Sequence, residues 1–338
     1  MSGKFFAVDR ESWGAACALG LNPACAYLVM AAGTGGDNRR TAWSVHAIEK
    51  YAGIGRKRAH DAVVGLIEAR LVRKVKDTGR PAYVIGLDGA ERNKGDALIW
   101  LPNALVTGLT VGTDSPLAQI RQTQNQNALR LLIEFYGAHR LLDDSGIDRR
   151  ALRQEYTAMH LYERGQHVVW AFTAGVRRAW PDKLPAQAFM TGRIETVDGQ
   201  KRDAGWPVFW EALSLLAAIK LLEFVPYLFE SGDNGETLHA VGWWSGEEAE
   251  RTAAVAASRA GAVLLDAASR KKIPSNALLI PAPRHLGEVQ VVGIARLKFR
   301  PRTSMTAAWF SGMEEQNRRA AARYMEILSQ YSPAAEVN

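Results

Sequence analysis

Cations gather at the start of one short segment, with the spacing needed to contact an anion. Arg56, Lys57 and Arg58 are consecutive, and His60 follows within one helical turn. A helix beginning here would have the positive end of its dipole at these residues, so a solvated helix would favour Asp or Glu instead. Guanidinium and ammonium groups suit this position when phosphates or guanine edges supply the negative charge. The cluster therefore predicts contact with a polyanion.

Two helices joined by a glycine turn are predicted to hold this cluster. Residues 44–52 have the spacing of a short amphipathic helix, and Thr41 or Ser44 can cap its start. Gly53 supplies the left-handed residue that a sharp turn between helices needs. A second helix over 56–69 then buries one face and leaves the cations on the other. The buried face is expected to hold Ala59, Val63, Leu66 and Ile67.

A basic hairpin is expected after the second helix. Residues 71–76 alternate like a strand, 77–80 are typical of a turn, and 82–85 predict the return strand. Cations on this hairpin would project toward a sugar-phosphate backbone or a minor groove. Two arginines before the first helix are also placed to touch a backbone. The hairpin and flanking cations are Lys74, Lys76, Arg80, Arg39 and Arg40.

Short helix, turn, basic-headed helix and hairpin, in this order, resemble a winged helix-turn-helix. The resemblance covers residues 23–87, and the stretch LIEARLVRKV ahead of the hairpin is similar to the winged helices of bacterial regulators and replication initiators. It implies that the second helix docks in the major groove of double-stranded DNA while the hairpin contacts the backbone. Ser44, at the start of the first helix, joins the expected DNA contacts.

A similar order of elements recurs further along the chain with different chemistry. Residues 206–220 predict a helix, 221–229 a strand and 237–244 a return strand. The helix is apolar almost all round and carries one cation, Lys220, so it is expected to pack against a partner or another domain. Two winged helices in tandem resemble plasmid and phage replication initiators. A large insertion and the unequal charge of the two copies depart from that pattern.

The sequence therefore predicts an α+β chain that is mainly helical. A winged helix-turn-helix domain is expected over 1–90, and a second winged-helix-like domain over 98–245 with an insertion at about 160–205. A C-terminal α/β extension fills 246–338. Further helices are expected at 116–139, 148–156, 246–270 and 313–330, and a strand or hairpin at 288–299.

Charge forms two basic zones around an acidic centre. Residues 39–80 hold 11 Lys or Arg and 4 Asp or Glu, a balance of +7, and residues 270–324 hold 11 and 3, a balance of +8. Residues 81–269 hold 18 and 23, a balance of −5. Two basic zones suit a long nucleic acid, although solvated basic faces also explain them. In the second zone Lys298, Arg300 and Arg302 alternate, which predicts a secondary nucleic-acid patch on one strand face.

The sequence shows no clear signal for a disulfide, a membrane segment, a metal site or catalysis. Cys17 and Cys25 are expected to be reduced thiols, with no histidine at metal spacing around them. No apolar stretch is long enough for a membrane span or a signal peptide, so a cytoplasmic location is expected. The 7 histidines fall in no catalytic or metal-binding motif, so no enzyme activity, cofactor or metal is expected.

The leading interpretation is a sequence-specific double-stranded DNA-binding protein of a bacterium or mobile element. It would act in transcription regulation, as a dimer on inverted repeats, or initiate replication of a plasmid or phage from direct repeats. The initiator would also contact replication machinery. Two alternatives stay open: a protein-interaction scaffold built on winged helices, and a nuclease or recombinase with a DNA-binding head.

Overall fold

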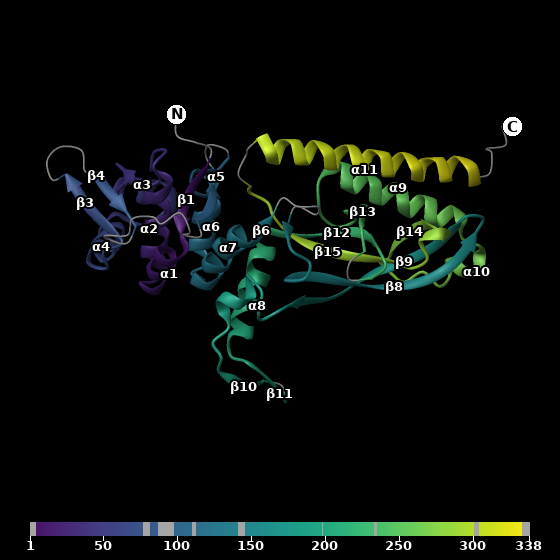
Figure 1. Ribbon diagram of the computed structural model, residues 1–338, viewed down its shortest axis with the longest axis horizontal. Helices are drawn as coiled ribbons and strands as arrows, with labels where there is room; N and C mark the ends of the chain where they lie inside the picture. The colour runs from purple at the N-terminus through teal and green to yellow at the C-terminus, as the bar shows by residue number, and fades with distance from the viewer. Residues whose placement is uncertain are drawn as a thin grey trace. The chain divides into compact units, whose positions relative to one another are not determined.

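The chain divides into two compact units, neither of which is one continuous segment. The computed structural model describes residues 5–76, 82–86, 98–109, 113–140, 146–197, 199–232, 235–300 and 304–332. The first unit comprises Met1–Ala138, Leu184–Leu221 and Leu297–Thr303. The second comprises His139–Lys183, Leu222–Arg296 and Ser304–Asn338. Figure 1 labels their helices and strands.

A buried helix, α2 (Leu21–Ala32), lies at the centre of the first part of the first unit. Every residue from Ala24 to Ala32 is buried, and Pro23 sits in the first turn, where its missing N–H costs no helical hydrogen bond. The helices α1 (Arg10–Ala18), α3 (Val45–Ala52) and α4 (Arg56–Glu68) pack against α2. Next to them, β2 (Arg40–Thr41), β4 (Ala82–Ile85) and β3 (Val72–Lys76) form a sheet in that order.

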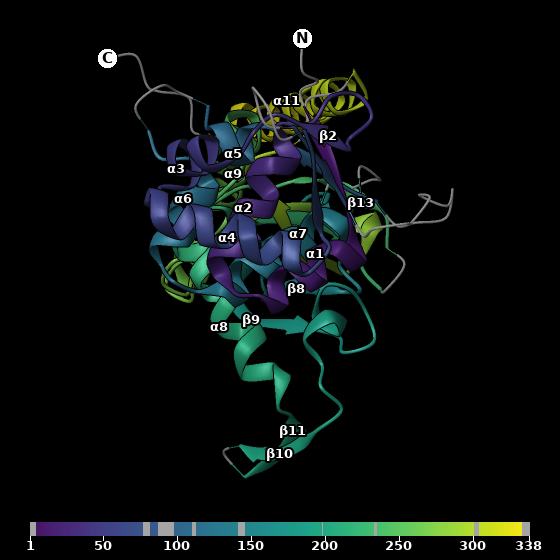
Figure 2. The same ribbon diagram turned by 90° about the vertical axis from the view of Figure 1, so that its left-hand side faces the viewer.

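The rest of the first unit is joined to this part by a strand pair. The strand β1 (Phe5–Asp9) pairs antiparallel with β5 (Leu98–Pro102). The helices α5 (Ala104–Thr107), α6 (Pro116–Gln122), α7 (Gln126–Ala138) and α8 (Gly205–Ala218) follow, with α7 packed on α8. Ahead of α8 are a short 3-10 helix, η1 (Ala186–Phe189), and a hairpin of β10 (Ile194–Val197) and β11 (Gln200–Asp203). Figure 2 shows this hairpin projecting beyond the end of α8.

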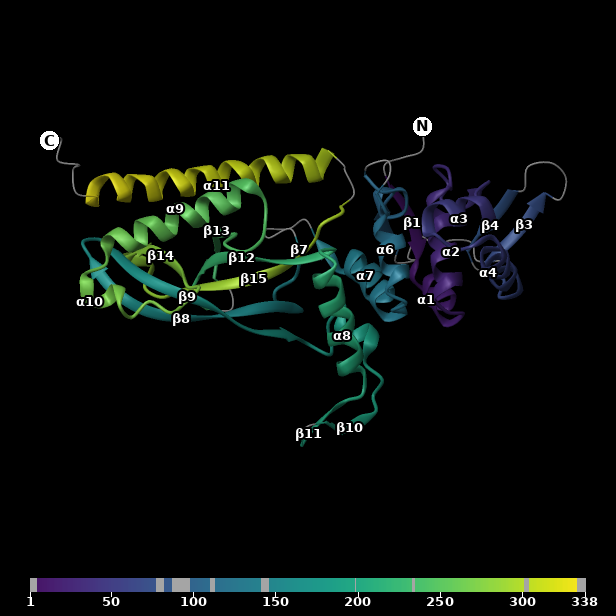
Figure 3. The same cartoon turned by 180° about the vertical axis from the view of Figure 1, so that it is seen from behind.

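The second unit is built on a curled antiparallel sheet of six strands. Their order is β13 (Thr237–Ala240), β12 (Leu222–Glu230), β15 (Val289–Leu297), β8 (Leu152–Arg164), β9 (His167–Ala179) and β14 (Leu278–Pro283). Two long helices, α9 (Glu248–Leu264) and α11 (Ser304–Tyr331), lie side by side over the sheet (Figure 3). The smaller elements are β6 (His139–Arg140), β7 (Gly146–Ile147), α10 (Ala267–Arg270) and η2 (Arg284–Leu286).

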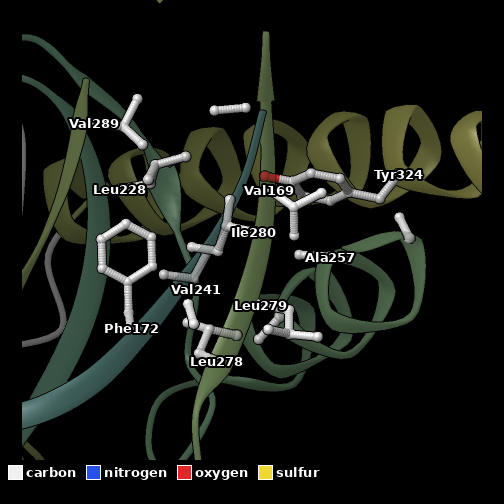
Figure 4. Close-up of a cluster of buried hydrophobic side chains, with 14 of the residues drawn as sticks. Val169, Phe172, Leu228, Val241, Ala257, Leu278, Leu279, Ile280, Val289 and Tyr324 are labelled. Carbon is white, nitrogen blue, oxygen red and sulfur yellow. The ribbon is translucent and has the colours of Figure 1, made fainter. Parts of the chain in front are cut away.

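Apolar side chains from the helices and the sheet close one core of the second unit (Figure 4). Ala257 of α9 and Tyr324 of α11 meet Val169 of β9 and Leu279 of β14 there. Gly261 of α9 lies so close to the sheet that an added Cβ would be 2.9 Å from the Leu279 Cβ. Small residues along α9 therefore let the helix approach the strands closely.

The expectation of a mainly helical chain is wrong. Of the residues that the structure describes, 46% are helical and 29% are in strands. The helix expected at 148–156 is instead the start of β8, which forms a hairpin of two 13-residue strands with β9. This pairing contains two register shifts, between Gln154 and Tyr156 and between His160 and Tyr162. Such bulges interrupt the two-residue alternation by which a strand is recognised in a sequence.

The elements expected for the helix and hairpin of a second winged-helix-like domain are present, but they fall in different units. The expected helix is α8, which belongs to the first unit, whereas the expected hairpin strands β12 and β13 are part of the six-stranded sheet. The helix expected over 116–139 is also interrupted. Gln124 has a φ of 57°, and the Asn125 side chain accepts a hydrogen bond from the Ala128 amide at 2.8 Å, so α6 ends and α7 begins there.

Among the described residues, none of the helices combines the length and the apolar character required to cross a membrane.

Candidate nucleic-acid interface

The predicted basic cluster lies at the start of α4. Arg56, Lys57, Arg58 and His60 are all exposed, and Ala59 between them is buried. The opposite side of the helix packs on α2. Its buried residues are Ala59, Ala62, Val63 and Leu66, with Ile67 half-buried.

Gly53 sets the turn that presents this helix. It adopts the expected left-handed conformation, with φ 62° and ψ 26°, and its N–H donates to the Glu49 carbonyl at 3.2 Å. Ile54 is fully buried and fixes the turn to the core. Ser44 occupies the N-cap position of α3, but its hydroxyl makes no capping hydrogen bond.

The start of α4 combines a missing side-chain cap with a cluster of cations. Its N-cap is Gly55, which offers no side-chain acceptor, and its first turn holds no acidic residue. The helices α2 and α8 also begin without a side-chain cap, but their first turns hold no cation. By contrast, Asp9 caps α1, Ser115 caps α6, and Glu247 forms a capping box with Glu250 on α9. Three cations at an uncapped helix start suit an external anion, which would satisfy both the first-turn N–H groups and the side chains.

Hydrogen bonds to the Asp37 side chain position Arg39 and Arg40, which precede α3. The Asp37 carboxylate accepts hydrogen bonds from the backbone amides of Arg39 at 3.0 Å and Arg40 at 3.2 Å. The bond from the Arg39 amide contributes most to holding the pKa of Asp37 below its usual range. The Arg39 carbonyl accepts from the Ile85 amide at 2.9 Å, so the chain enters the sheet here. Arg39 is half-buried and Arg40 is exposed.

Arg40 and Arg73 lie on one face of the three-stranded sheet. Both pair with Val84, Arg40 from β2 and Arg73 from β3, so the three residues form a row across the strands. Thr41 and Tyr83, which pair with each other, are buried on the opposite face. Both arginines are exposed. The sequence pattern does not single out Arg73, because only the pairing register shows that it shares a face with Arg40.

The other predicted hairpin cations have different surroundings. Lys74 pairs with Tyr83 and so begins on the buried face, although its side chain is exposed. A register shift follows, after which Lys76 pairs with Ala82. Arg80 lies outside the described residues, as does Arg302.

The expected basic strand face near the C-terminus is not formed. The strand β15 ends at Leu297, before Lys298 and Arg300. Residues 298–300 belong to the first unit, in which the Lys298 amide donates to the Leu221 carbonyl at 3.2 Å. The Arg300 Nε donates to the Leu297 carbonyl at 2.7 Å, so part of that guanidinium is used within the chain.

No protein-family model matches the chain, and searches against curated proteins and solved structures return no match.

Proposed function

We propose that the chain binds double-stranded DNA through the basic cluster of α4 and the Arg40–Arg73 row of the adjoining sheet. The observation that carries the proposal is the uncapped start of α4, where Arg56, Lys57 and Arg58 are exposed together. Cations at a helix start oppose the helix dipole, and α4 has no acid or hydroxyl there to offset them, whereas α1, α6 and α9 are capped by side chains.

In this proposal the first turn of α4 enters the major groove. Arginine there can donate two parallel hydrogen bonds to a guanine edge or a phosphate, and lysine can contact phosphate as a point charge. Arg40 and Arg73 contact the sugar-phosphate backbone and fix the orientation of the helix. The buried side of α4 holds the helix on α2, so the exposed cations face the DNA from a fixed position.

The biological role that follows is transcription regulation or initiation of replication. Selection of bound sequences from random duplexes distinguishes the two roles. Inverted half-sites would fit a dimeric regulator, and direct repeats would fit an initiator.

The direct test compares two triple variants in equilibrium binding to the selected duplex. The first is Arg56→Ala, Lys57→Ala and Arg58→Ala. The control is Arg270→Ala, Lys271→Ala and Lys272→Ala, which removes the same charge from exposed positions at the end of α10 and just beyond it. The proposal predicts a loss of binding in the first variant and wild-type binding in the control. Equal affinity of both variants would overturn it.

A further inference from the structure

The helices α4 and α8 each end in a turn of the same conformation. Arg70 after α4 and Lys220 after α8 both have a φ of 58°. The Leu71 amide donates to the Leu66 carbonyl at 2.9 Å, and the Leu221 amide donates to the Leu216 carbonyl at 3.0 Å. A non-glycine residue in the left-handed region is uncommon, so two such turns with matching hydrogen bonds point to a repeated structure.

Burial follows the same repeat. Positions 61–70 and 211–220 show the same order of exposed, half-buried and buried residues, one for one. The sequences correspond as well, with DAVVGLIEAR in the first and EALSLLAAIK in the second. The second segment is therefore the counterpart of the first, displaced by 150 positions.

The elements ahead of the two helices repeat too. In the first module, residues 5–86, α2 packs on both β1 and α4. In the second module, residues 98–138 with 184–221, α7 packs on β5 and α8. The helices α1 and α6 each directly precede the central helix of their module, α2 or α7, and each is capped by a side chain, Asp9 or Ser115. The antiparallel β1–β5 pair joins the modules, with Ala7 opposite Trp100 at its middle.

The second module has a different surface where the first carries its cations. The counterparts of Arg56, Lys57 and His60 are Trp206, Pro207 and Trp210. The two tryptophan rings stack with centroids 5.8 Å apart and an interplanar angle of 17°. Phe189 of η1 packs on Phe209 of α8 with centroids 5.9 Å apart. A segment of the same chain thus covers the start of α8.

The start of α8 is also closed sterically. A Cβ added to Gly205 would lie 2.0 Å from the Phe189 carbonyl oxygen, whereas one added to its counterpart Gly55 would meet no atom within 4 Å. The start of α8 therefore has no room for the external anion that suits the start of α4.

The β10–β11 hairpin is the element that the second module presents instead. Asp203 anchors its base by accepting hydrogen bonds from the backbone amides of Gly192 and Gly205, each at 2.7 Å. Glu195 pairs with Arg193 at 3.0 Å. Lys201 and Arg202 are exposed on β11, on opposite faces of the ribbon because they are consecutive in a strand. Arg202 Nε donates to Gln200 Oε1 at 3.1 Å. A two-stranded ribbon is narrow enough to lie along a DNA groove.

We infer that the β10–β11 hairpin is a second duplex-DNA contact, made through Lys201 and Arg202, so that the two modules engage neighbouring segments of one duplex. This inference rests on the proposed function of the first module. The hairpin contact is made to the backbone, with Lys201 and Arg202 toward the phosphates on the two sides of the groove, and base reading stays with α4.

The test measures affinity against salt for two duplexes that contain the selected site, of about 12 and about 24 base pairs, a little over one and two helical turns. The variant Lys201→Ala with Arg202→Ala removes the hairpin cations and leaves the Asp203 anchor intact. The matched control is Lys271→Ala with Lys272→Ala. On the long duplex the hairpin variant should reduce the slope of log affinity against log salt by about 1.8, because each phosphate contact contributes about 0.9. On the short duplex it should match the wild type.

The outcomes separate the inference from the proposed function. The hairpin variant can keep the wild-type slope on the long duplex while the α4 variant (Arg56→Ala, Lys57→Ala and Arg58→Ala) loses binding. This result overturns the inference and leaves the proposed α4 contact in place. An equal loss on both duplexes overturns the two-segment arrangement. Wild-type binding by both the hairpin variant and the α4 variant overturns both proposals.

Discussion

Arg296 and Glu250 form a buried bidentate ion pair in the second unit. Arg296 Nη1 lies 2.6 Å from Glu250 Oε1, and Nη2 lies 2.9 Å from Oε2. Arg296 is on β15 and Glu250 is in the first turn of α9, so the pair ties a central strand to a covering helix. Tyr227 also contributes, because its hydroxyl lies 3.1 Å from Nη1. Burial alone would lower the pKa of Arg296, but Tyr227 and Glu250 raise it overall, so the guanidinium stays charged.

Breaking this pair should destabilise the second unit strongly. Glu250→Gln leaves the Arg296 charge buried, and among the described residues its remaining carboxylate partner is Glu223, at 3.3 Å. Loss of one partner of a buried ion pair costs about 3–5 kcal/mol. Denaturant unfolding monitored by tryptophan fluorescence measures the change. Glu314→Gln, at an exposed ion pair on α11, is the control and should leave the midpoint unchanged. A midpoint for Glu250→Gln equal to that of the control would contradict this prediction.

Protonation of His239 should make the second unit sensitive to acid. The ring is buried between the Ala240 carbonyl, 2.9 Å from Nδ1, and the Tyr324 hydroxyl, 2.9 Å from Nε2. Burial is the main reason that its pKa falls to about 4. Above pH 6.5 both folded and unfolded states hold neutral His239. Between about 6.5 and 4 only the unfolded state gains the proton, so stability falls by roughly 3 kcal/mol as pH decreases.

The comparison that isolates this effect uses His239→Gln. Urea unfolding at pH 7.5 and at pH 4.5 gives a stability difference for each protein. The wild type should lose more stability than the variant over this pH interval. Acidic groups titrate in both proteins, whereas His239 titrates only in the wild type. Equal losses would mean that His239 is protonated in the folded state as readily as in the unfolded one.

Gly33 is required by the side chain of Trp43. A Cβ at position 33 would lie 2.3 Å from the Trp43 Cγ and 2.7 Å from the Thr41 Oγ1. Trp43 is also stacked on Tyr51 of α3 with ring centroids 4.8 Å apart, so it has little freedom to move. Gly33→Ala should therefore destabilise the first unit by about 1–3 kcal/mol and weaken DNA binding by shifting α3.

Gly14→Ala is the matched substitution for this test. Gly14 lies within α1, where an added Cβ meets no atom within 4 Å. This change should stabilise the first unit by about 0.5–1 kcal/mol, because alanine favours the helix. Thermal unfolding of both variants measures the contrast, and a Gly33→Ala protein as stable as Gly14→Ala would contradict the packing argument.

The two cysteines should react only when the first unit opens. Cys17 and Cys25 are buried and form no disulfide, as the sequence predicts. Burial raises the pKa of each thiol to about 12, so few thiolates exist at neutral pH. A chromogenic disulfide reagent at pH 8 should label both rapidly in denaturant and slowly in the native protein. Rapid native labelling would contradict the burial of these thiols.

The sequence predicts the α3–α4 region well because its signals are local. Gly53 marks the turn, and the spacing of Ala59, Val63 and Leu66 marks the buried face of α4, so the expected and observed helices agree within a residue or two. Each of these signals depends on residues close together in the chain, and no distant contact changes them.

Relationships that depend on pairing between distant segments cannot be predicted from the local sequence. The long hairpin β8–β9 is shifted in register twice, which removes its alternation. Arg73 shares a face with Arg40 only through the pairing of both with Val84. The helix α8 and the strand β12 are adjacent in sequence but belong to different units. Residue types and their local spacing do not predict any of these three relationships.

The salt dependence of DNA binding reports how many phosphates the start of α4 contacts. Fluorescence anisotropy on the selected duplex gives the slope of log affinity against log salt for the wild type and for Arg56→Ala, Lys57→Ala and Arg58→Ala. The slope should fall by about 2.7 in this variant if all three cations contact phosphates, and by about 0.9 less for each one that contacts a base edge instead. The Arg270→Ala, Lys271→Ala and Lys272→Ala control should keep the wild-type slope. An α4 variant with the affinity and slope of the wild type would contradict the claim that α4 contacts DNA.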